Sequence, residues 1–388
     1  MKYITGEEGF VFDVDSLYAR FEALTDQRAR RGIRYPLPKA LTLILLAKLG
    51  GEDTVRGMAS WLKHRAEKLA QALGLARARM PHRTTMSRIL GQAVMVEEFE
   101  EIVGNFFREG LTQGDELVIA IDGKTMRGTI EAGQNQGVHL LGAYVPGEGV
   151  VLYQTEVASK ENEIPAAPRV LERLDLREGV VVGDAMHTQR RLSAQIVAEG
   201  GDYVWVVKEN QPQLRDDIVA AFQPVPCVPG FHPGFRDHPT AETLDKGHGR
   251  IEKRTITVSS ELKGFLDWPG MGQVFQLERH FVYPKKGSIQ EETTYGITSL
   301  SAQRASPARL LELVRAYWGI ENGLHYRRDV TFQEDRCRLR TGHAAHMMAA
   351  LNNLAIGLIA RCGFSEAPEA RRQFCAEPLK ALALIIHA

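Results

Sequence analysis

Short β-branched apolar segments alternate with amphipathic segments between Leu117 and Phe222, and this alternation constrains the fold more than any other feature of the sequence. The first three apolar segments follow one another closely, and residues 146–149, between the second and the third, are typical of a hairpin turn. Strand-like and helix-like segments then take turns along the chain. This order predicts an α/β domain with a mixed sheet and helices on its faces. The strand-like segments are LVIAID, VHLLGAYV, VVLYQTEV, VVVGD and DYVWVV.

The region after Phe222 has a different pattern. It begins with a Pro-, Gly- and His-rich stretch and continues with strand-like segments, which predicts a β-rich insertion over residues 224–304. Apolar residues at helical spacing return at Pro307 and again over residues 343–359. The β-rich stretch therefore interrupts the alternation, and helices follow it.

The N-terminal region is expected to be helical. Apolar spacing predicts helices over residues 37–50 and 53–75, and a further helix opens after Pro81 with Thr84 and Thr85 as its cap. Four parts are therefore expected in the chain. They are a helical N-terminal module (1–112), the first part of a core (113–223), the β-rich insertion (224–304) and a part that completes the core (305–388).

Positive charge is concentrated in this N-terminal region, although the net charge of the whole chain is +0. Residues 28–88 contain 14 Lys or Arg against three acids, a local net charge of +11. Duplex DNA is bound largely through Lys and Arg that neutralise phosphates, so this asymmetry favours a module that holds a polyanion, and a helix-turn-helix-like reader is compatible with it. A solvated basic helical face is the alternative. The candidate DNA contacts are Arg30, Arg31, Arg34, Arg83 and Arg88.

Two classes of protein do not fit the sequence. No apolar run approaches the roughly 18–20 residues of a membrane span, and the acidic, polar start of the chain is unlike a secretory signal, so we expect a cytoplasmic protein with no membrane partner. The cysteines are scattered without a Cys-x-x-Cys pair, which argues against a zinc ribbon or a disulfide framework. We interpret all of them as free thiols: Cys227, Cys337, Cys362 and Cys375.

Two aspartates end strand-like segments of the predicted core. Asp122 ends LVIAID, and Asp184 ends VVVGD. A carboxylate at the end of a buried strand is costly unless it is paired, hydrogen-bonded or metal-bound, although a lone one more often caps a turn. Carboxylates that leave neighbouring strands at one sheet edge could converge. Hard divalent ions such as Mg²⁺ take oxygen ligands, and a third acid would let two ions clamp the attacking and leaving oxygens of a displacement.

Six motifs, in a fixed order, carry a resemblance to a known family. They are IDGKTMRGT, KENEIPAAPRVLERLDL, GDAMHTQ, VKENQPQL, KGHGRIEKR and YWGIENGLHYRRDVTFQEDRCRLR. They resemble bacterial insertion-sequence transposases of the DDE superfamily, in the branch of the H-repeat-associated proteins. RGIRYPL and PHRTTMSRIL are similar to the N-terminal associated region of that branch. The resemblance implies a ribonuclease H-like catalytic core interrupted by a β-rich insertion, with Mg²⁺ held by Asp122, Asp184 and Glu321.

Glu321 lies in a predicted helix. At helical spacing Tyr317, His325 and Arg328 share its face, so an acid, an imidazole and a guanidinium would face one phosphate region. An exposed face with ordinary ion pairs is the alternative. Three nearby acids are rival third ligands: Asp329, Glu334 and Asp335.

The surroundings of Glu321 depart from the family pattern. Related cut-and-paste families have Tyr, Arg and Lys at i−7, i−4 and i+7 from this glutamate, where this chain has Val314, Tyr317 and Arg328. In the closer branch His-Trp precedes Gly-Ile-Glu-Asn, whereas this chain has Tyr317 and Trp318. The departure bears on how Tyr317 contacts phosphate and leaves the expected role of Glu321 unchanged.

Cationic groups flank the acidic positions. Positive charge beside phosphoryl chemistry stabilises developing negative charge, but each of these residues could equally be a surface ion pair of little energetic effect. His187 and His325 are interpreted as supporting or DNA-contacting groups rather than metal ligands, because a magnesium site prefers oxygen. The expected phosphate contacts are Lys124, Arg127, Lys160, Lys208, His325 and Arg328.

These observations predict a DNA transposase that uses two-metal phosphoryl transfer. With two Mg²⁺ ions, for which Mn²⁺ can substitute, a phosphodiester at the element end is hydrolysed and the freed 3′-hydroxyl attacks target DNA. The expected partners are the terminal inverted repeats and a target duplex, and a homodimer is expected because two ends must be brought together. A metal-dependent nuclease without strand transfer and a non-catalytic DNA-binding relic are the alternatives.

Overall fold

The computed structural model describes residues 3–5, 10–31, 33–111, 116–223, 238–247 and 249–387. The chain divides into two compact units. The first consists of residues 1–114, 123–162 and 320–388, and the second of residues 115–122 and 163–319. Two of the four boundaries along the chain fall inside regular structure, one in a strand at residues 122–123 and one at the end of a long helix at residues 319–320. Each unit is therefore assembled from distant parts of the sequence.

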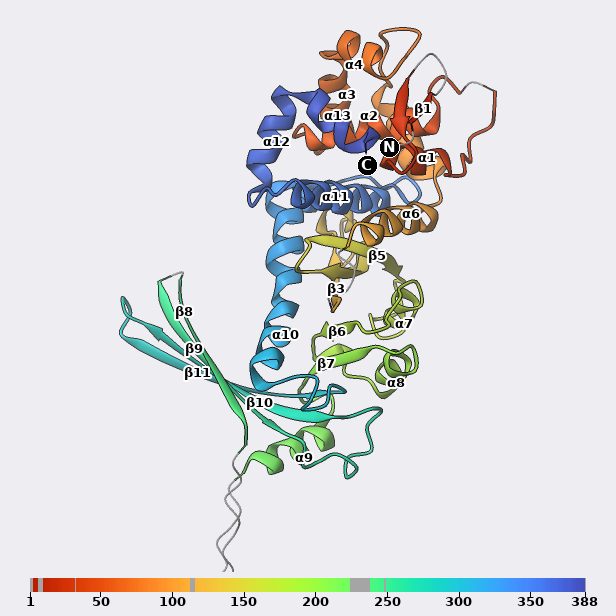
Figure 1. The fold of residues 1–388 in the computed structure, drawn as a ribbon. Coiled ribbons are helices and arrows are strands. Elements are labelled where there is room, and N and C mark those ends of the chain that lie inside the picture. Colours follow the sequence, from red (N-terminus) through yellow and green to blue (C-terminus); the bar gives the residue numbers. More distant parts are fainter. Residues whose placement is uncertain are drawn as a thin grey trace, which may run out of the picture. The chain divides into compact units, whose positions relative to one another are not determined.

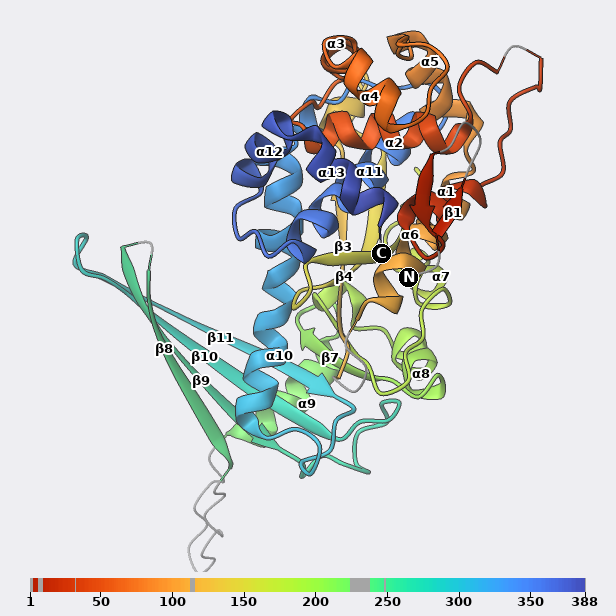
Figure 2. The same ribbon diagram turned by 45° about the horizontal axis from the view of Figure 1, so that its top comes forward.

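Helix α2 (Leu37–Leu49) is the centre of the helical part of the first unit (Figure 2). Nearly all of its side chains are buried, including the amphipathic Lys39 and Lys48. A helix that is apolar on every face must be covered on every face, and α2 contacts α1, α3, α11, α12 and α13. The surrounding helices are α1 (Leu17–Glu22), α3 (Val55–Lys63), α4 (Ala66–Ala72), α5 (Arg83–Arg88), α6 (Val96–Glu109), α11 (Ala344–Arg361), α12 (Ala367–Ala376) and α13 (Pro378–Ile386).

The structure confirms the predicted helix over residues 37–50 and corrects the helix predicted over residues 53–75, which is divided into α3 and α4. The break falls at Arg65, whose backbone leaves the helical region at φ −119° and ψ 15°. Its guanidinium donates to the carbonyl oxygens of Trp61 and Cys375, the second 310 residues away in the sequence. A tertiary contact of this kind is not visible in local periodicity.

Two other expectations for the N-terminal region were wrong. The cap of α5 is His82, whose ring nitrogen accepts from the amide of Thr84, so the threonines are inside the helix rather than before it. The region also contains a two-stranded antiparallel sheet of β1 (Tyr3–Thr5) and β2 (Val11–Asp13), which the helical prediction omitted. Such short strands carry too little periodicity to be recognised.

A β-hairpin lies beside these helices in the first unit. Strands β4 (His139–Val145) and β5 (Val150–Val157) are antiparallel, and Gly149 adopts φ +71° in the predicted turn. Helices α6 and α11 both contact β5 (Figure 1). Gly104 of α6 lies directly on this strand, because a Cβ there would come within 1.9 Å of the Leu152 carbonyl oxygen.

The second unit is built on a sheet with both parallel and antiparallel neighbours. Strands β3 (Val118–Thr125), β6 (Val180–Gly183) and β7 (Asp202–Val207) are parallel, and β11 (Ser288–Thr298) pairs antiparallel with β7. Three further antiparallel strands follow: β10 (Gln273–Tyr283), β9 (Arg250–Ser259) and β8 (Thr240–Gly247). The hydrogen-bonded order is β5-β4-β3-β6-β7-β11-β10-β9-β8, with β3 shared between the units. The predicted mixed sheet is therefore confirmed.

Strands β8 to β11 come from the region predicted as a β-rich insertion. Strand β8, in the Gly- and His-containing stretch, was not predicted. These strands continue the sheet of the second unit, because Tyr295 of β11 is in register with Val207 of β7. The helices of this unit are α7 (Ala166–Leu171), α8 (Arg190–Ala198), α9 (Pro212–Phe222) and α10 (Pro307–Ile320).

Within the described residues, no helix combines the length and the apolar character that a membrane crossing requires. Three of the cysteines are free thiols, as predicted, and Cys227 lies outside the described residues. They are Cys337, Cys362 and Cys375.

Candidate active site and basic pocket

Asp122 and Asp184 follow directly after a pair of register partners in neighbouring parallel strands. Ile121 of β3 pairs with Gly183 of β6, and this is the last pair of the ladder. Asp184 follows the end of β6, whereas β3 continues to Thr125, so the expectation that Asp122 ends its strand was wrong. The strand continues because β3 also pairs with β4 on its other side. Both side chains are partly exposed at the point where the β3–β6 ladder ends.

Tyr317 is a hydrogen-bond partner of Asp122. Its hydroxyl, in the last turn of α10, donates to Oδ1 of Asp122 over 3.3 Å. The sequence indicated only that Tyr317 replaces a cationic residue of related families. It contained no signal for this contact, because residues 122 and 317 are far apart in the sequence.

Glu321 begins the segment that follows α10 directly. The segment is π-helical rather than α-helical, over Glu321–His325 and again over Arg327–Thr331. His325 lies beside Glu321 as predicted, but a π-helix bonds i to i+5, so the α-helical spacing used to add Arg328 to the same face does not apply. The Glu321 side chain is 52% exposed, and its Oε2 lies 3.7 Å from Nδ1 of the buried His325.

Gly323 explains how this π-helical turn packs within the first unit. A Cβ at this position would come within 2.4 Å of the Tyr144 hydroxyl oxygen on β4. The turn can therefore lie close to β4 only while residue 323 has no side chain. Burial raises the pKa of the Tyr144 hydroxyl, so this neighbour is a neutral phenol.

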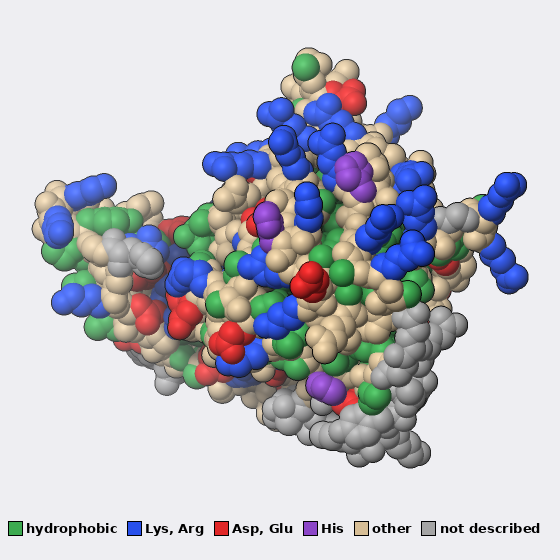
Figure 3. Space-filling view, turned by 90° about the horizontal axis from the view of Figure 1, so that it is seen from above, with side chains coloured by type: hydrophobic (Ala, Val, Ile, Leu, Met, Phe, Trp, Pro, Cys, Tyr) green, Lys and Arg blue, Asp and Glu red, His purple; other side chains and the backbone are tan. Residues whose placement is uncertain are grey.

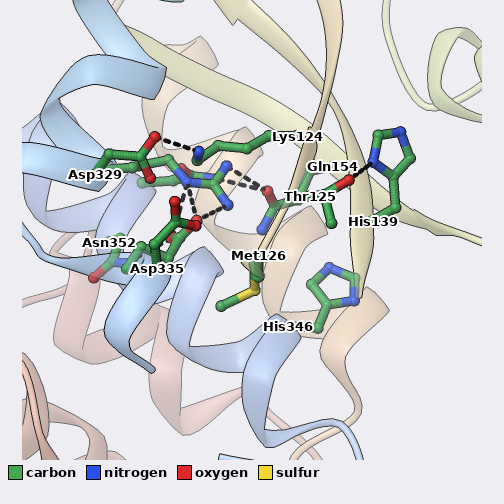
Figure 4. A network of polar contacts seen from close by, with 12 residues as sticks. Lys124, Thr125, Met126, His139, Gln154, Asp329, Asp335, His346 and Asn352 are labelled. Carbon is green, nitrogen blue, oxygen red and sulfur yellow. Dashed lines mark hydrogen bonds and ion pairs between the residues drawn. The ribbon is translucent and has the colours of Figure 1, made fainter. Parts of the chain in front are cut away.

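Lys124 and Arg328, two of the predicted phosphate contacts, each form an ion pair, and Figure 4 shows the pair of Lys124 with Asp329. Lys124 Nζ donates to Oδ2 of Asp329 over 2.6 Å. Arg328 is only 2% exposed and forms a buried ion pair with Glu334, with 2.7 Å between Nη2 and Oε1. The expected phosphate contact of Arg328 is therefore corrected: its guanidinium is enclosed and neutralises a buried carboxylate. Lys124 is 9% exposed.

The three acids considered as alternatives to Glu321 are held by contacts of the same kind. Burial alone would raise the pKa of Glu334, but the charge and hydrogen bonds of Arg328 hold this pKa below its usual value, with a further hydrogen bond from Asn352. Asp329 accepts from Lys124, and Asp335 accepts from the backbone amide of Arg127 over 3.0 Å. Each rival acid thus has a structural partner within the first unit.

Three other predicted phosphate contacts lie at the surface. Arg127 is 81% exposed on its side chain, with only a long ion pair of 3.7 Å to Asp335. Lys160 and Lys208 are exposed as well. Their roles toward phosphate stay predictions.

Positive side chains surround a hollow in the N-terminal helical region (Figure 3). The hollow has a volume of about 1530 Å³, and no Asp or Glu is among the described residues that line it. It includes four of the five predicted DNA contacts and leaves out Arg30. Sequence reasoning found the charged segment but missed the other cations, because only folding brings them to one concavity. The lining cations are Arg28, Arg31, Arg34, Arg56, Lys63, Arg79, Arg83 and Arg88.

Comparison with known families identifies the class of protein. Residues 113–358 match the family described as "Transposase DDE domain", and residues 18–107 match the family described as "DDE_Tnp_1-associated". Because the first match covers more than half of the chain, this protein belongs to the DDE transposase family. The predicted resemblance is thus confirmed.

The chain is also similar to individual proteins and to a solved structure. The chain is 28% identical over 356 residues to "H repeat-associated putative transposase YhhI" of Escherichia coli, covering 89% of this chain and 91% of the relative. It is 33% identical over 263 residues to "Uncharacterized protein in dhlA 3'region" of Xanthobacter autotrophicus, covering 66% of this chain and 86% of the relative. Among solved structures, a chain of a piggyBac transposase synaptic complex with hairpin DNA matches at 10% identity and a TM-score of 0.39, covering 94% of this chain and 76% of that one.

Proposed function

We propose that this protein is an insertion-sequence transposase that cuts the ends of its element and joins them to target DNA. In this proposal a ribonuclease H-like core carries Asp122, Asp184 and Glu321 as its catalytic acids. The observation that carries the proposal is the register of Ile121 and Gly183 in neighbouring parallel strands. Asp122 and Asp184 directly follow these two paired residues. The match to the DDE transposase family over residues 113–358 supports the same reading.

The donor set fits divalent magnesium. Asp122, Asp184 and Glu321 offer carboxylate oxygens, the ligand type that Mg²⁺ prefers, and all three side chains are at least partly exposed to solvent. When bound, two Mg²⁺ ions would supply the Lewis acidity that activates water and stabilises charge on the leaving oxygen. Mn²⁺, which takes similar oxygen ligands, would substitute for it.

The residues around the acids would orient them and the DNA. Tyr317 holds one carboxylate oxygen of Asp122, and the Met186 amide holds one of Asp184 over 2.9 Å, which would orient both carboxylates. Arg127, Lys160 and Lys208 have exposed side chains that would reach phosphates.

The basic pocket would hold the terminal inverted repeat. The described residues that line the pocket include Lys and Arg but no Asp or Glu. Such a pocket suits the phosphate backbone of DNA, because cations that neutralise phosphates release the counterions condensed on DNA. The N-terminal module of residues 1–112 would thus bind DNA, while residues 113–223 and 305–388 form the catalytic core around the β-rich insertion. A homodimer on DNA would bring the two element ends together.

The test is a cleavage and strand-transfer assay on end-containing DNA with Mg²⁺. Asp122→Asn, Asp184→Asn and Glu321→Gln should each abolish cleavage while DNA binding persists, because each change removes a metal ligand and leaves the basic pocket intact. Asp216→Asn, in an aspartate whose side chain is 78% exposed on α9, is the matched control and should cleave normally. Activity in one of the first three variants would remove that residue from the site.

The same assay separates the alternatives. A nuclease would release cut ends without strand-transfer products. A DNA-binding relic would give no product from the unmodified protein, while still binding end DNA.

A further inference from the structure

The turn after β6 determines where the Asp184 carboxylate points. Asp184 has an extended backbone and caps the short 3₁₀ turn Ala185–His187, with its Oδ1 accepting from the amide of Met186. A change in this turn would therefore move the carboxylate. The hydroxyl of Thr188, directly after the turn, donates to the Val206 carbonyl oxygen over 2.6 Å.

Side chains from the segment after β7 hold the backbone of this turn. Asn210 Nδ2 donates to the Ala185 carbonyl oxygen over 2.6 Å, and Gln211 Nε2 donates to the Thr188 carbonyl oxygen over 2.9 Å. The Ala185 carbonyl oxygen also accepts from the Thr188 amide over 3.2 Å, so Asn210 adds a second hydrogen bond to a carbonyl of the turn. The two amides thus hold both ends of the turn.

A buried histidine holds the same turn from within the protein. His187 is completely buried, and its Nε2 lies 3.2 Å from Oε2 of Glu163 and 4.0 Å from Oδ1 of Asp184. The Glu163 side chain is only 11% exposed. Because polar groups are costly to bury away from other polar groups, the nearby carboxylate favours a ring orientation that keeps Nε2 facing Glu163.

We propose that Glu163, Asn210 and Gln211 are positioning residues that fix the Asp184 carboxylate through the 185–188 turn. The proposal gives a physical role to two sequence motifs, because KENEIPAAPRVLERLDL contributes Glu163 and VKENQPQL contributes Asn210 and Gln211. Partners that orient a ligand commonly change metal affinity by about 10- to 100-fold when they are removed. The inference rests on the proposed role of Asp184.

The test compares two nearly isosteric changes, Asn210→Asp and Glu163→Gln, with controls at exposed glutamates nearby. Asn210→Asp replaces the donor that faces the Ala185 carbonyl by an acceptor, and Glu163→Gln removes the charge beside His187. Both should raise the Mg²⁺ concentration for half-maximal cleavage by about tenfold or more, and should weaken Mn²⁺ binding measured directly by electron paramagnetic resonance. Glu209→Gln and Glu172→Gln should change neither quantity.

Thermal unfolding of every variant separates positioning from simple destabilisation. Activity of Asn210→Asp and Glu163→Gln that recovers at high Mg²⁺ in a folded protein supports the inference. An unchanged metal requirement, or a loss of activity that follows the unfolding temperature and ignores Mg²⁺, overturns it. If Asp184→Asn itself cleaves DNA, Asp184 leaves the proposed catalytic site, whereas an inactive Asp184→Asn beside a normal Asn210→Asp removes only the positioning role.

Discussion

The Tyr317 hydroxyl donates to Oδ1 of Asp122 over 3.3 Å, and Tyr317 stands four residues before Glu321 in the sequence. Tyr317 lies in α10, and Glu321 begins the segment that follows this helix directly. The helix that leads to Glu321 thus also supplies a hydrogen bond to Asp122. The position that is cationic in related families is here used to orient a carboxylate.

Tyr317→Phe should reduce cleavage without preventing DNA binding. A hydrogen bond to a charged group contributes about 1.5–3 kcal/mol, and at this length we expect the lower end, a loss of about tenfold in the cleavage rate. Single-turnover cleavage at saturating Mg²⁺ measures the effect. A variant with the unmodified rate would show that the contact does not matter to the chemistry.

Arginines that line the basic pocket should contribute more to DNA binding than equally exposed arginines outside it. Arg79 lines the pocket, whereas Arg77, two residues earlier, does not. Arg79→Ala should weaken binding and reduce the slope of log affinity against log salt by about 0.9 if it contacts one phosphate. Arg77→Ala is the matched control. Equal effects of the two changes would argue that only overall charge matters.

Gly323→Ala should destabilise the protein through its contact with Tyr144. The added methyl group would come within 2.4 Å of the Tyr144 hydroxyl oxygen, and such overpacking costs about 1–3 kcal/mol. Tyr144→Phe removes that oxygen, so the double variant should regain part of the lost stability. Urea unfolding of the four proteins in this cycle measures the coupling, and strictly additive effects would contradict the proposed clash.

Glu334 should make stability sensitive to acid. Its pKa in the folded protein lies below the usual value, so its contribution is present above the unfolded pKa and is lost as the pH falls through the folded pKa. Glu334→Gln should cost about 3–5 kcal/mol near neutral pH, because Arg328 is left buried without its partner.

Unfolding free energies near pH 7 and pH 3 check this expectation. The difference between the unmodified protein and Glu334→Gln should shrink as the pH falls through the folded pKa of Glu334, because the glutamate then takes up a proton and both side chains are uncharged. Glu172→Gln, at an exposed glutamate, is the control and should follow the unmodified protein at both values. A constant difference would show that the charge of Glu334 is not what stabilises the fold.

The sequence by itself determined the mixed sheet, the central helix α2, the hairpin of β4 and β5, and the position of Asp184 at a strand end. These features depend on local periodicity and turn chemistry, which are properties of neighbouring residues. The family membership was also readable from ordered motifs. The structural features could be predicted from short stretches of the chain, whereas the family membership was indicated by the order of six motifs along it.

Only the tertiary structure decided which partners the functional side chains have. In the folded chain Arg328 forms a buried ion pair with Glu334, Tyr317 donates to Asp122, and Asn210 donates to the turn after Asp184. The physical reason is that an ion pair or hydrogen bond is decided by distance in space, whereas periodicity reports only which face of an element is buried. The same limit explains why the charged N-terminal segment could be found from the sequence while its pocket could not.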